Sequence, residues 1–214
     1  PGEEPGVYWS GTSHASLHTS EILKLMYEAG CTHLVYGLES FDPIVLKNLG
    51  KGTSVKKNVN SVGECLKSGI IPIPNIIIGF PEETFESVRN TIVELIKLGI
   101  HVKPHFATAY PGSEWYYKYK DSIIKQYEGS LEDYIKDLGD ASKITGVISH
   151  NFSGLELLGL QEIVAKRNLR LLDQASKNWV KSKVESVAVP QESTNFVRKK
   201  INGPISNEGT SIYL

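Results

Sequence analysis

The chain has 214 residues, with 23 basic and 24 acidic side chains, a formal net charge of −1 and 40% hydrophobic residues. This composition is typical of a globular protein, and the scattered charges give no reason to expect nucleic acid or an anionic membrane as a partner. No apolar run approaches the roughly 18 to 20 residues that span a bilayer, and the first residues, PGEEPG, lack the features of a signal peptide. We therefore expect a cytoplasmic protein whose partner is a small-molecule or peptide substrate.

The first half of the chain repeats one pattern three times, after an apolar segment at residues 7–15 that predicts a strand. Each repeat has a helix with apolar residues three and four positions apart, a helix-ending glycine, an apolar strand and a polar cluster. The predicted strands are short and mostly apolar, as strands are when both of their faces are covered. They occupy residues 34–38, 75–80 and 105–110.

Strands that alternate with helices are parallel, so the fold is either a doubly wound sheet or a barrel. We predict the α/β class, with an open partial (βα) barrel of about four parallel strands plus C-terminal helices. In both architectures, loops at the carboxyl ends of the strands build the ligand site. The polar clusters SGTSH, GLES, GFPEET and YPGSE should therefore lie on one rim.

The repeated pattern ends near residue 113, and this change predicts three parts of the chain. Residues 1–113 form the partial barrel, residues 114–183 form a helical C-terminal extension that packs on it, and residues 184–214 form an extended or mobile tail. Within the extension, the apolar spacing of residues 155–180 predicts one long amphipathic helix.

Two polar residues in or at the end of predicted strands, Glu39 and Asn75, have no partner nearby in the sequence. A buried carboxylate or amide without a partner costs several kcal/mol, so another group must contact each of them. A capping bond from Glu39 or Ser40 to a helix that begins near Pro43 would explain one of them. A ligand with hydroxyl or amino donors would explain both, and Gly79 would let the backbone approach a flat ligand closely.

Four segments, in this order and spacing, resemble the second half of the radical S-adenosylmethionine (SAM) enzymes: AGCTHLVYGLES, KGTS, GIIPIPNIIIGFPEET and AYPGSEWY. The resemblance covers roughly residues 7–175 and is greatest to the subgroup with an N-terminal cobalamin-binding domain. GLES resembles the fourth-strand motif of that family, and NIIIGFPE resembles its fifth-strand motif, G-x-I-x-G-x-x-E, with Asn75 at the position of the first glycine. The resemblance implies an enzyme that generates a 5′-deoxyadenosyl radical from SAM and then transfers a methyl group or rearranges a ring.

The same resemblance implies five cofactor-binding positions. Glu39 and Ser40 correspond to residues that contact the ribose or methionine part of SAM, and Asn75 corresponds to one that reaches a ribose hydroxyl. The adenine would lie against the backbone of Ile77 and Gly79. A nucleoside requires such an apolar, backbone-lined slot with a few polar groups.

Two further rim residues are predicted to contact the substrate. His14 ends the first strand, where relatives in the family often carry an arginine, and could either handle protons or hydrogen-bond within the barrel. Tyr110, which precedes Pro111, could either contact the substrate or close the turn.

The chain also departs from the family. The family binds a [4Fe-4S] cluster through a C-x3-C-x2-C loop after its first strand, and iron–sulfur clusters require such thiolates. The two cysteines here, Cys31 and Cys65, match neither the spacing nor the place of that loop, so we expect buried reduced thiols and no metal ligands in this chain. We therefore expect a C-terminal fragment that is inactive alone. The missing N-terminal half would carry the ligands of the cluster, and a cobalamin-binding domain, if the protein has one, would also lie there.

Two other classes of function remain open. One is a different βα-barrel enzyme that performs acid–base chemistry with Glu39, His14 and Glu82, which requires these side chains to converge. The other is a binding or scaffold module that has the fold and no catalytic activity.

The segment GKGTS at residues 50–54 superficially resembles a phosphate-binding loop. A true phosphate loop follows a strand and has Ser or Thr directly after the Gly-Lys pair, whereas here Gly52 intervenes and the preceding segment is helical. We interpret it as a turn that follows a short helix beginning at Asp42-Pro43.

Overall fold

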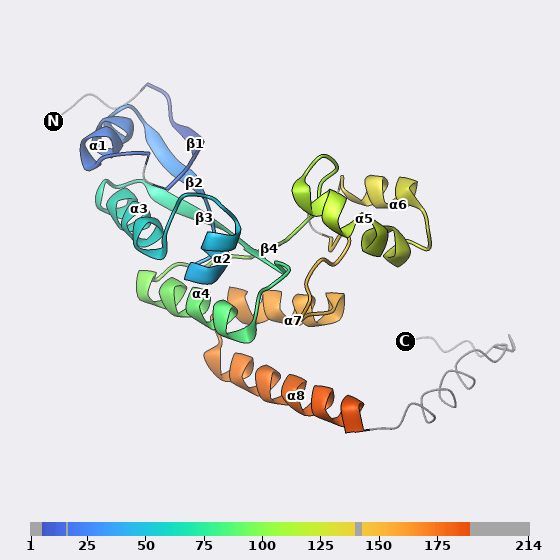
Figure 1. Ribbon diagram of the computed structural model, residues 1–214. Coiled ribbons are helices and arrows are strands. Elements are labelled where there is room, and N and C mark those ends of the chain that lie inside the picture. The colour runs from blue at the N-terminus through green and yellow to red at the C-terminus, as the bar shows by residue number, and fades with distance from the viewer. Residues whose placement is uncertain (1–5, 16, 140–142, 189–214) are drawn as a thin grey trace, which may run out of the picture. The chain divides into compact units, whose positions relative to one another are not determined.

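The computed structural model describes residues 6–15, 17–139 and 143–188 (Figure 1). The chain divides into two compact units, Pro1–Leu172 and Asp173–Leu214, and each is considered by itself. The fold and the site described below belong to the first unit.

The described residues contain four strands and eight helices. The strands are β1 (Trp9–Ser13), β2 (Cys31–Glu39), β3 (Ile71–Ile78) and β4 (His105–Phe106). The helices are α1 (Ser20–Glu28), α2 (Pro43–Asn48), α3 (Val55–Lys67), α4 (Phe85–Leu98), α5 (Glu114–Gln126), α6 (Leu131–Asp137), α7 (Gly154–Ala165) and α8 (Leu169–Ala188).

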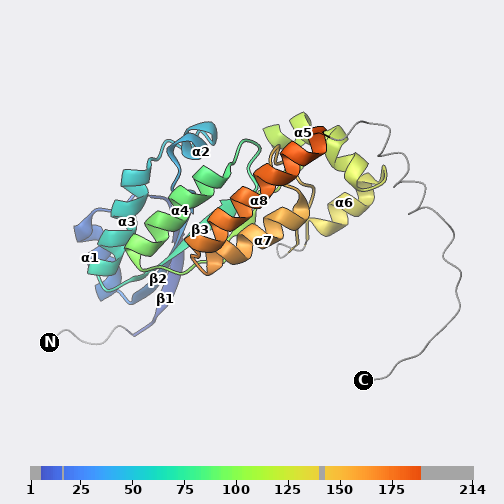
Figure 2. The same ribbon diagram turned by 90° about the horizontal axis from the view of Figure 1, so that it is seen from below.

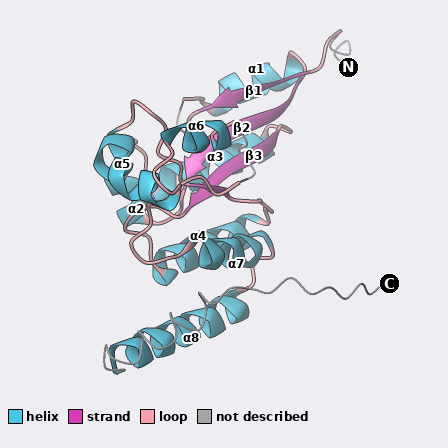
Figure 3. Ribbon diagram, turned by 90° about the vertical axis from the view of Figure 1, so that its right-hand side faces the viewer, coloured by secondary structure: helices cyan, strands magenta, loops and turns pink. Residues whose placement is uncertain are grey.

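The four strands form one parallel sheet in the order β1-β2-β3-β4. Because the order of the strands follows the chain without reversal, right-handed crossovers place the connecting helices on the same face of the sheet. Helices α1 and α3 contact β2 and β3 respectively, and α3 contacts both α1 and α4 (Figures 1 and 3). The predicted open partial (βα) barrel with four parallel strands is confirmed.

The pattern of burial shows that the other face of the sheet is only partly covered. In β3, Pro72, Ile76 and Ile78 are buried, whereas Ile71 and Ile73 are 53% and 44% exposed. Side chains alternate between the faces of a strand, so the exposed isoleucines share the face that lines the interior of a closed barrel.

Side chains cap the starts of the helices. The side chains of Thr19, Ser54 and Thr84 accept hydrogen bonds from the first turns of α1, α3 and α4. Asp42 accepts two backbone N–H groups at the start of α2, with Pro43 in the first position of that helix. These caps satisfy N–H groups that have no partner within the helix.

Strands β3 and β4 differ from the predicted strands in their length. β3 begins at Ile71, four residues before the predicted start, and includes Pro72 and Pro74. Prolines two positions apart lack N–H donors on the same side of the strand, and this is tolerated where that side has no partner. β4 is only two residues long and pairs with Ile77 and Ile78, beyond both prolines.

The segments after β4 build an apolar cluster beyond the carboxyl end of the sheet, where α5 and α6 lie together (Figures 1 and 2). It joins residues of α2 and of the loops after β3 and β4 to residues of α5 and α6. Its buried members are Val45, Phe80, Ala107, Ala109, Tyr116, Ile123, Tyr134 and Ile148. The cluster therefore connects the partial barrel to the helices that follow it.

One long helix was predicted over residues 155–180, and this prediction was wrong. The chain forms α7 and α8 instead, because Arg167 has a φ of 51° and cannot continue a right-handed helix. The side chain of Asn168 then accepts the N–H of Leu171 and caps the new helix. No helix in the described ranges combines the length and the apolar character needed to cross a membrane.

The predicted borders at residues 113/114 and 183/184 stay predictions. Helix α8 is described as far as Ala188, and the remainder of the predicted tail, residues 189–214, lies outside the described residues.

A glycine in the loop between α6 and α7 provides a test of the apolar cluster around α5 and α6. Gly146 has a φ of 64°, and a Cβ atom there would lie 3.0 Å from Ile123 and 3.2 Å from Tyr134, both of which are fully buried. We expect Gly146→Ala to lower the free energy of unfolding by about 2 to 4 kcal/mol, because it combines backbone strain with overpacking.

The matched control is Gly99→Ala. Gly99 has a similar φ of 69° but no atom within 4 Å of the position of a Cβ, so only the backbone cost of about 1 kcal/mol should appear. Urea denaturation of both variants measures the difference, and equal losses would show that the cluster around Gly146 is not tightly packed.

A candidate cofactor site at the carboxyl ends of β2 and β3

Glu39 occupies an irregular position at the end of β2. The pairing of β2 with β3 matches Gly37 with Asn75 and then shifts, so that Glu39 matches Ile76. Glu39 has a φ of 63°, which is rare for a residue other than glycine and costs about 1 to 3 kcal/mol. Such strain at the end of a strand is common at functional sites.

The carboxylate of Glu39 turns back over the backbone of Gly37. A Cβ atom on Gly37 would lie 3.1 Å from Glu39 Oε1 and 3.0 Å from Lys51 Nζ. The absence of a side chain at Gly37 therefore leaves the space in which Glu39 and Lys51 meet.

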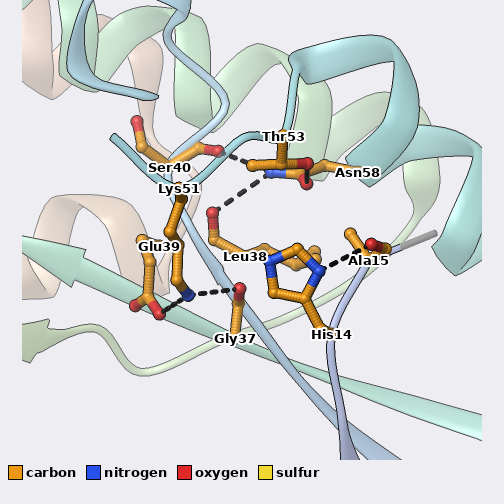
Figure 4. Close-up of polar contacts among 9 residues, drawn as sticks. All are labelled: His14, Ala15, Gly37, Leu38, Glu39, Ser40, Lys51, Thr53 and Asn58. Atoms are coloured by element: carbon orange, nitrogen blue, oxygen red, sulfur yellow. Dashed lines mark hydrogen bonds and ion pairs between the residues drawn. The ribbon is translucent and has the colours of Figure 1, made fainter. Parts of the chain in front are cut away.

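Lys51 is the partner that the sequence analysis did not find for Glu39. Its ammonium forms an ion pair with Glu39 Oε1 and donates a hydrogen bond of 2.8 Å to the carbonyl oxygen of Gly37 (Figure 4). Lys51 lies in the loop between α2 and α3, in the segment that we interpreted as a turn. In the sequence, the only sign that Lys51 belongs to the site was its place in KGTS, one of the four segments that resemble the family.

The second carboxylate oxygen of Glu39 has no donor. Oε2 is buried and makes no hydrogen bond to any residue that the structure describes. The Glu39 side chain is 13% exposed, and that of Lys51 is 30% exposed. A buried carboxylate oxygen without a donor is costly, so Oε2 is the atom of this site at which a further donor would be most stabilising.

Ser40 connects the end of β2 to α4. The residue is 1% exposed, and its hydroxyl lies 3.2 Å from the Thr91 hydroxyl and accepts the N–H of Asp42. These contacts give Ser40 a structural role. Its predicted contact with the cofactor stays a prediction.

Asn58 holds the same turn from α3. Its amide nitrogen donates to the carbonyl oxygens of Leu38 and Ser40, each at 3.1 Å, and its oxygen accepts the Thr53 hydroxyl (Figure 4). Asn58 is fully buried. Its side chain therefore fixes the backbone carbonyl groups on either side of the strained residue Glu39.

Asn75 and Ile77 lie on β3, next to this turn. Both are partly exposed, whereas their neighbours Ile76 and Ile78 are buried, so they share the sheet face away from the helices. The Asn75 side chain makes no hydrogen bond within the described part of the chain and is matched in register with Gly37. Its amide is therefore available to a ligand on this face of the sheet, next to Gly37.

Gly79 has a structural reason to be glycine. Its φ is 89°, and a Cβ atom there would lie 3.1 Å from the Leu157 side chain on α7. Packing of α7 therefore requires this glycine whether or not a ligand approaches its backbone.

Glu83 is a buried carboxyl group that the sequence analysis missed. The residue is 2% exposed and accepts the N–H of Gly79 at 2.5 Å. Burial raises the pKa of Glu83 from 4.5 to about 8, which the N–H groups of Gly79 and Phe80 partly oppose and the charge of Asp42 reinforces. Its neighbour Glu82 is exposed and accepts the side chain of Asn48 at 2.7 Å.

The remaining predicted residues do not contact Glu39. His14 is half-buried, and its Nδ1 donates to the carbonyl oxygen of Ala15 (Figure 4). Tyr110 is 53% exposed. Within the described ranges, neither they nor Glu82 share a hydrogen bond or an ion pair with Glu39, so the convergence required for an acid–base site is not observed.

The cysteines do not fit an iron–sulfur cluster. Cys31 and Cys65 are buried, and their thiols donate to the carbonyl oxygens of His33 and Ile70. Burial raises the pKa of both thiols, that of Cys65 to about 11, whereas a cluster ligand is a thiolate. Among the described residues, no group of three or more His, Cys, Asp or Glu side chains could hold a metal ion.

The partial barrel with a polar cluster at its carboxyl rim is the architecture of a βα-barrel ligand site. Residues 3–95 match the Radical SAM superfamily, which is the family that the sequence resembles. The family recognised in the sequence is thereby confirmed.

Two curated relatives are methyltransferases by name. An uncharacterized methyltransferase of Pyrococcus horikoshii is 32% identical over 120 residues, which are 55% of this chain and 26% of the relative. The bacteriochlorophyllide d C-12(1)-methyltransferase of Chlorobaculum tepidum is 29% identical over 182 residues, 82% of this chain and 38% of that enzyme. The matches thus span less than two fifths of either relative.

A solved structure of the radical SAM methyltransferase TsrM from Kitasatospora setae is also similar. It is 24% identical, with a TM-score of 0.39, and the match covers 45% of this chain and 19% of that one. A likeness of this extent carries no argument about function.

Replacement of Asn58 tests whether this side chain fixes the turn at Glu39. We expect Asn58→Ala to lower the free energy of unfolding by about 2 to 4 kcal/mol, since it removes one donor from each of two buried carbonyl oxygens, those of Leu38 and Ser40. Asn60→Ala on the exposed side of α3 is the matched control and should change stability by less than about 0.5 kcal/mol. Chemical denaturation measures both, and equal effects would contradict the assignment.

The buried carboxyl group of Glu83 predicts a specific pH dependence. Its folded pKa of about 8 exceeds its usual value of 4.5, so between these pH values the folded state binds more protons than the unfolded state. The contribution of Glu83 to stability is therefore complete below about pH 4.5 and is lost as the pH rises through 8.

We expect Glu83→Gln, which resembles the protonated acid, to remove this component of the pH dependence. The free energy of unfolding of the wild type should fall by a few kcal/mol more between pH 5 and pH 8 than that of Glu83→Gln. The neighbouring exposed variant Glu82→Gln should follow the wild-type curve. Parallel curves for the wild type and Glu83→Gln would show that Glu83 titrates normally.

Proposed function

We propose that this chain forms the C-terminal part of the catalytic core of a radical SAM methyltransferase and that the Glu39 turn holds SAM. The observation that carries the proposal is Oε2 of Glu39, a buried carboxylate oxygen without a donor in the described chain, at the carboxyl end of a barrel strand. Barrel enzymes of this architecture bind their ligands at that end of the strands.

SAM carries the donors that this site lacks. Its ribose hydroxyls and its α-amino group can donate to Glu39 Oε2, while Lys51 keeps Oε1 occupied and the carboxylate fixed. The Asn75 amide, also without a partner among the described residues, can contact a second ribose hydroxyl. The adenine would lie against the backbone at Ile77 and Gly79, and Ser40 would contribute by supporting the turn.

When bound, SAM supplies a methyl group or a 5′-deoxyadenosyl radical. The residues described here bind and orient it, and the uncovered sheet face requires further chain to exclude water from the site. We propose that a missing N-terminal half of the same protein covers the exposed Ile71 and Ile73. That half would also supply the ligands of a [4Fe-4S] cluster, since the thiols of this chain do not fit one.

Methyl transfer is favoured over ring rearrangement by the names of the two curated relatives. One of them acts, by its name, on a bacteriochlorophyllide, and a small-molecule substrate is accordingly part of the proposal. His14 and Tyr110 remain proposed substrate contacts. Participation of cobalamin and a cytoplasmic location likewise stay predictions about the whole protein.

Titration of the purified chain with SAM, and with 5′-deoxyadenosine beside it, tests the proposed cofactor site. Without the cluster we expect saturable binding with a dissociation constant of roughly a millimolar. Glu39→Gln should weaken SAM binding by about tenfold, because it removes a charged acceptor, and Asn75→Ala by about threefold.

The matched control is Glu82→Gln, which changes an exposed carboxylate on the same rim and should leave SAM affinity unchanged. Circular dichroism establishes that every variant is folded. Binding that is absent in a folded wild-type chain, or that is equally strong in Glu39→Gln, would refute a cofactor contact at Glu39.

A further inference from the structure

The structure contains a pocket that shares none of the residues proposed to contact SAM. It has a volume of about 270 Å³ and is enclosed by α2, the loop after β3 and the first turns of α5. Glu39, Lys51 and Asn75 do not line it. Its lining residues are Val45, Asn48, Leu49, Phe80, Pro81, Glu82, Glu83, Glu114, Trp115, Lys118 and Tyr119.

Three aromatic residues, Phe80, Trp115 and Tyr119, line the pocket. Phe80 and Trp115 pack with ring centroids 5.7 Å apart and an interplanar angle of 59°. The ammonium of Lys118 lies 5.3 Å from the ring centroid of Tyr119, so this wall already has a cation over one of its rings. Aromatic faces attract cations at such distances.

The charged lining residues are mainly acidic. Glu82 accepts one hydrogen bond from Asn48, and Glu114 makes no ion pair within the described residues. Lys118 is the one basic residue in the lining. The raised pKa of Glu83 leaves that group largely protonated at neutral pH, so the net charge of the lining comes from Glu82 and Glu114 against Lys118.

We propose that this pocket binds a small aromatic amine in its cationic form. The ring of Trp115, which packs on the buried Phe80, would contact the flat apolar part, and the carboxylates of Glu82 and Glu114 would attract the ammonium group. The volume is below the roughly 300 to 1,000 Å³ of sites for drug-sized ligands, so the ligand has about the size of one ring with a short amine substituent. This inference does not rest on the proposed SAM site.

Three probes of the same shape and different charge test the proposal: benzylammonium, benzyl alcohol and benzoate. Each is titrated into the isotope-labelled full chain at pH 7, and the amide resonances of Glu82 and Trp115 are followed by NMR. We expect benzylammonium to shift these resonances saturably, benzyl alcohol to bind at least about threefold more weakly, and benzoate to bind more weakly still.

Two variants assign the charge preference to named carboxylates. Glu82→Gln and Glu114→Gln should each weaken benzylammonium binding by about threefold and leave benzyl alcohol binding unchanged. Glu132→Gln, an exposed carboxylate on α6 outside the pocket, is the matched control and should have no effect. Glu39→Gln should also leave benzylammonium binding unchanged, so failure of this proposal is distinguishable from failure of the SAM site.

Equal binding of the three probes would overturn the proposed preference for a cation. Resonances at Glu82 and Trp115 that do not move at saturating benzylammonium would overturn the pocket as a ligand site. Tighter binding of benzoate than of benzylammonium would assign the site to anions through Lys118 and would likewise contradict the proposal.

Discussion

The geometry of the rim depends on one ion pair, between Glu39 and Lys51. Glu39 stands in a backbone conformation that ordinary residues avoid, and its carboxylate lies over a glycine that leaves room for the pair. Lys51 secures one oxygen of that carboxylate and the Gly37 carbonyl at once. The buried Asn58 then fixes the backbone on both sides of Glu39. The orientation of the Glu39 carboxylate is therefore determined both by Lys51, from the loop before α3, and by Asn58, from α3 itself.

The sequence was sufficient to predict the order and type of the elements in the partial barrel. Helix caps such as Thr19 and Thr84, and the Asp42-Pro43 start of α2, act within a few residues and are visible in the sequence. A strict alternation of helix and strand leaves few parallel topologies. Local signals and chain connectivity therefore predicted the architecture.

The details of the site could not be predicted in the same way, because they depend on contacts distant in the sequence. Lys51 lies 12 residues from Glu39, and the loop geometry alone brings them together. In the Glu82-Glu83 pair, either carboxylate could have turned inward, and it is Glu83 that accepts the N–H of Gly79 in the folded chain. The break between α7 and α8 depends on the positive φ of Arg167. Arginine is not a residue type that marks the end of a helix, so no signal in the sequence indicates this break.

The two prolines of β3 affect whether the open edge of this strand can pair with a strand of another molecule. Between Ile71 and Asn75, β3 has β2 on one side and no described strand on the other. An open strand edge normally offers a row of N–H and C=O groups to a strand of a second molecule. Pro72 and Pro74 remove two successive donors from that row, so the edge of the sheet is a poor template for intermolecular β-pairing and for the aggregation that follows from it.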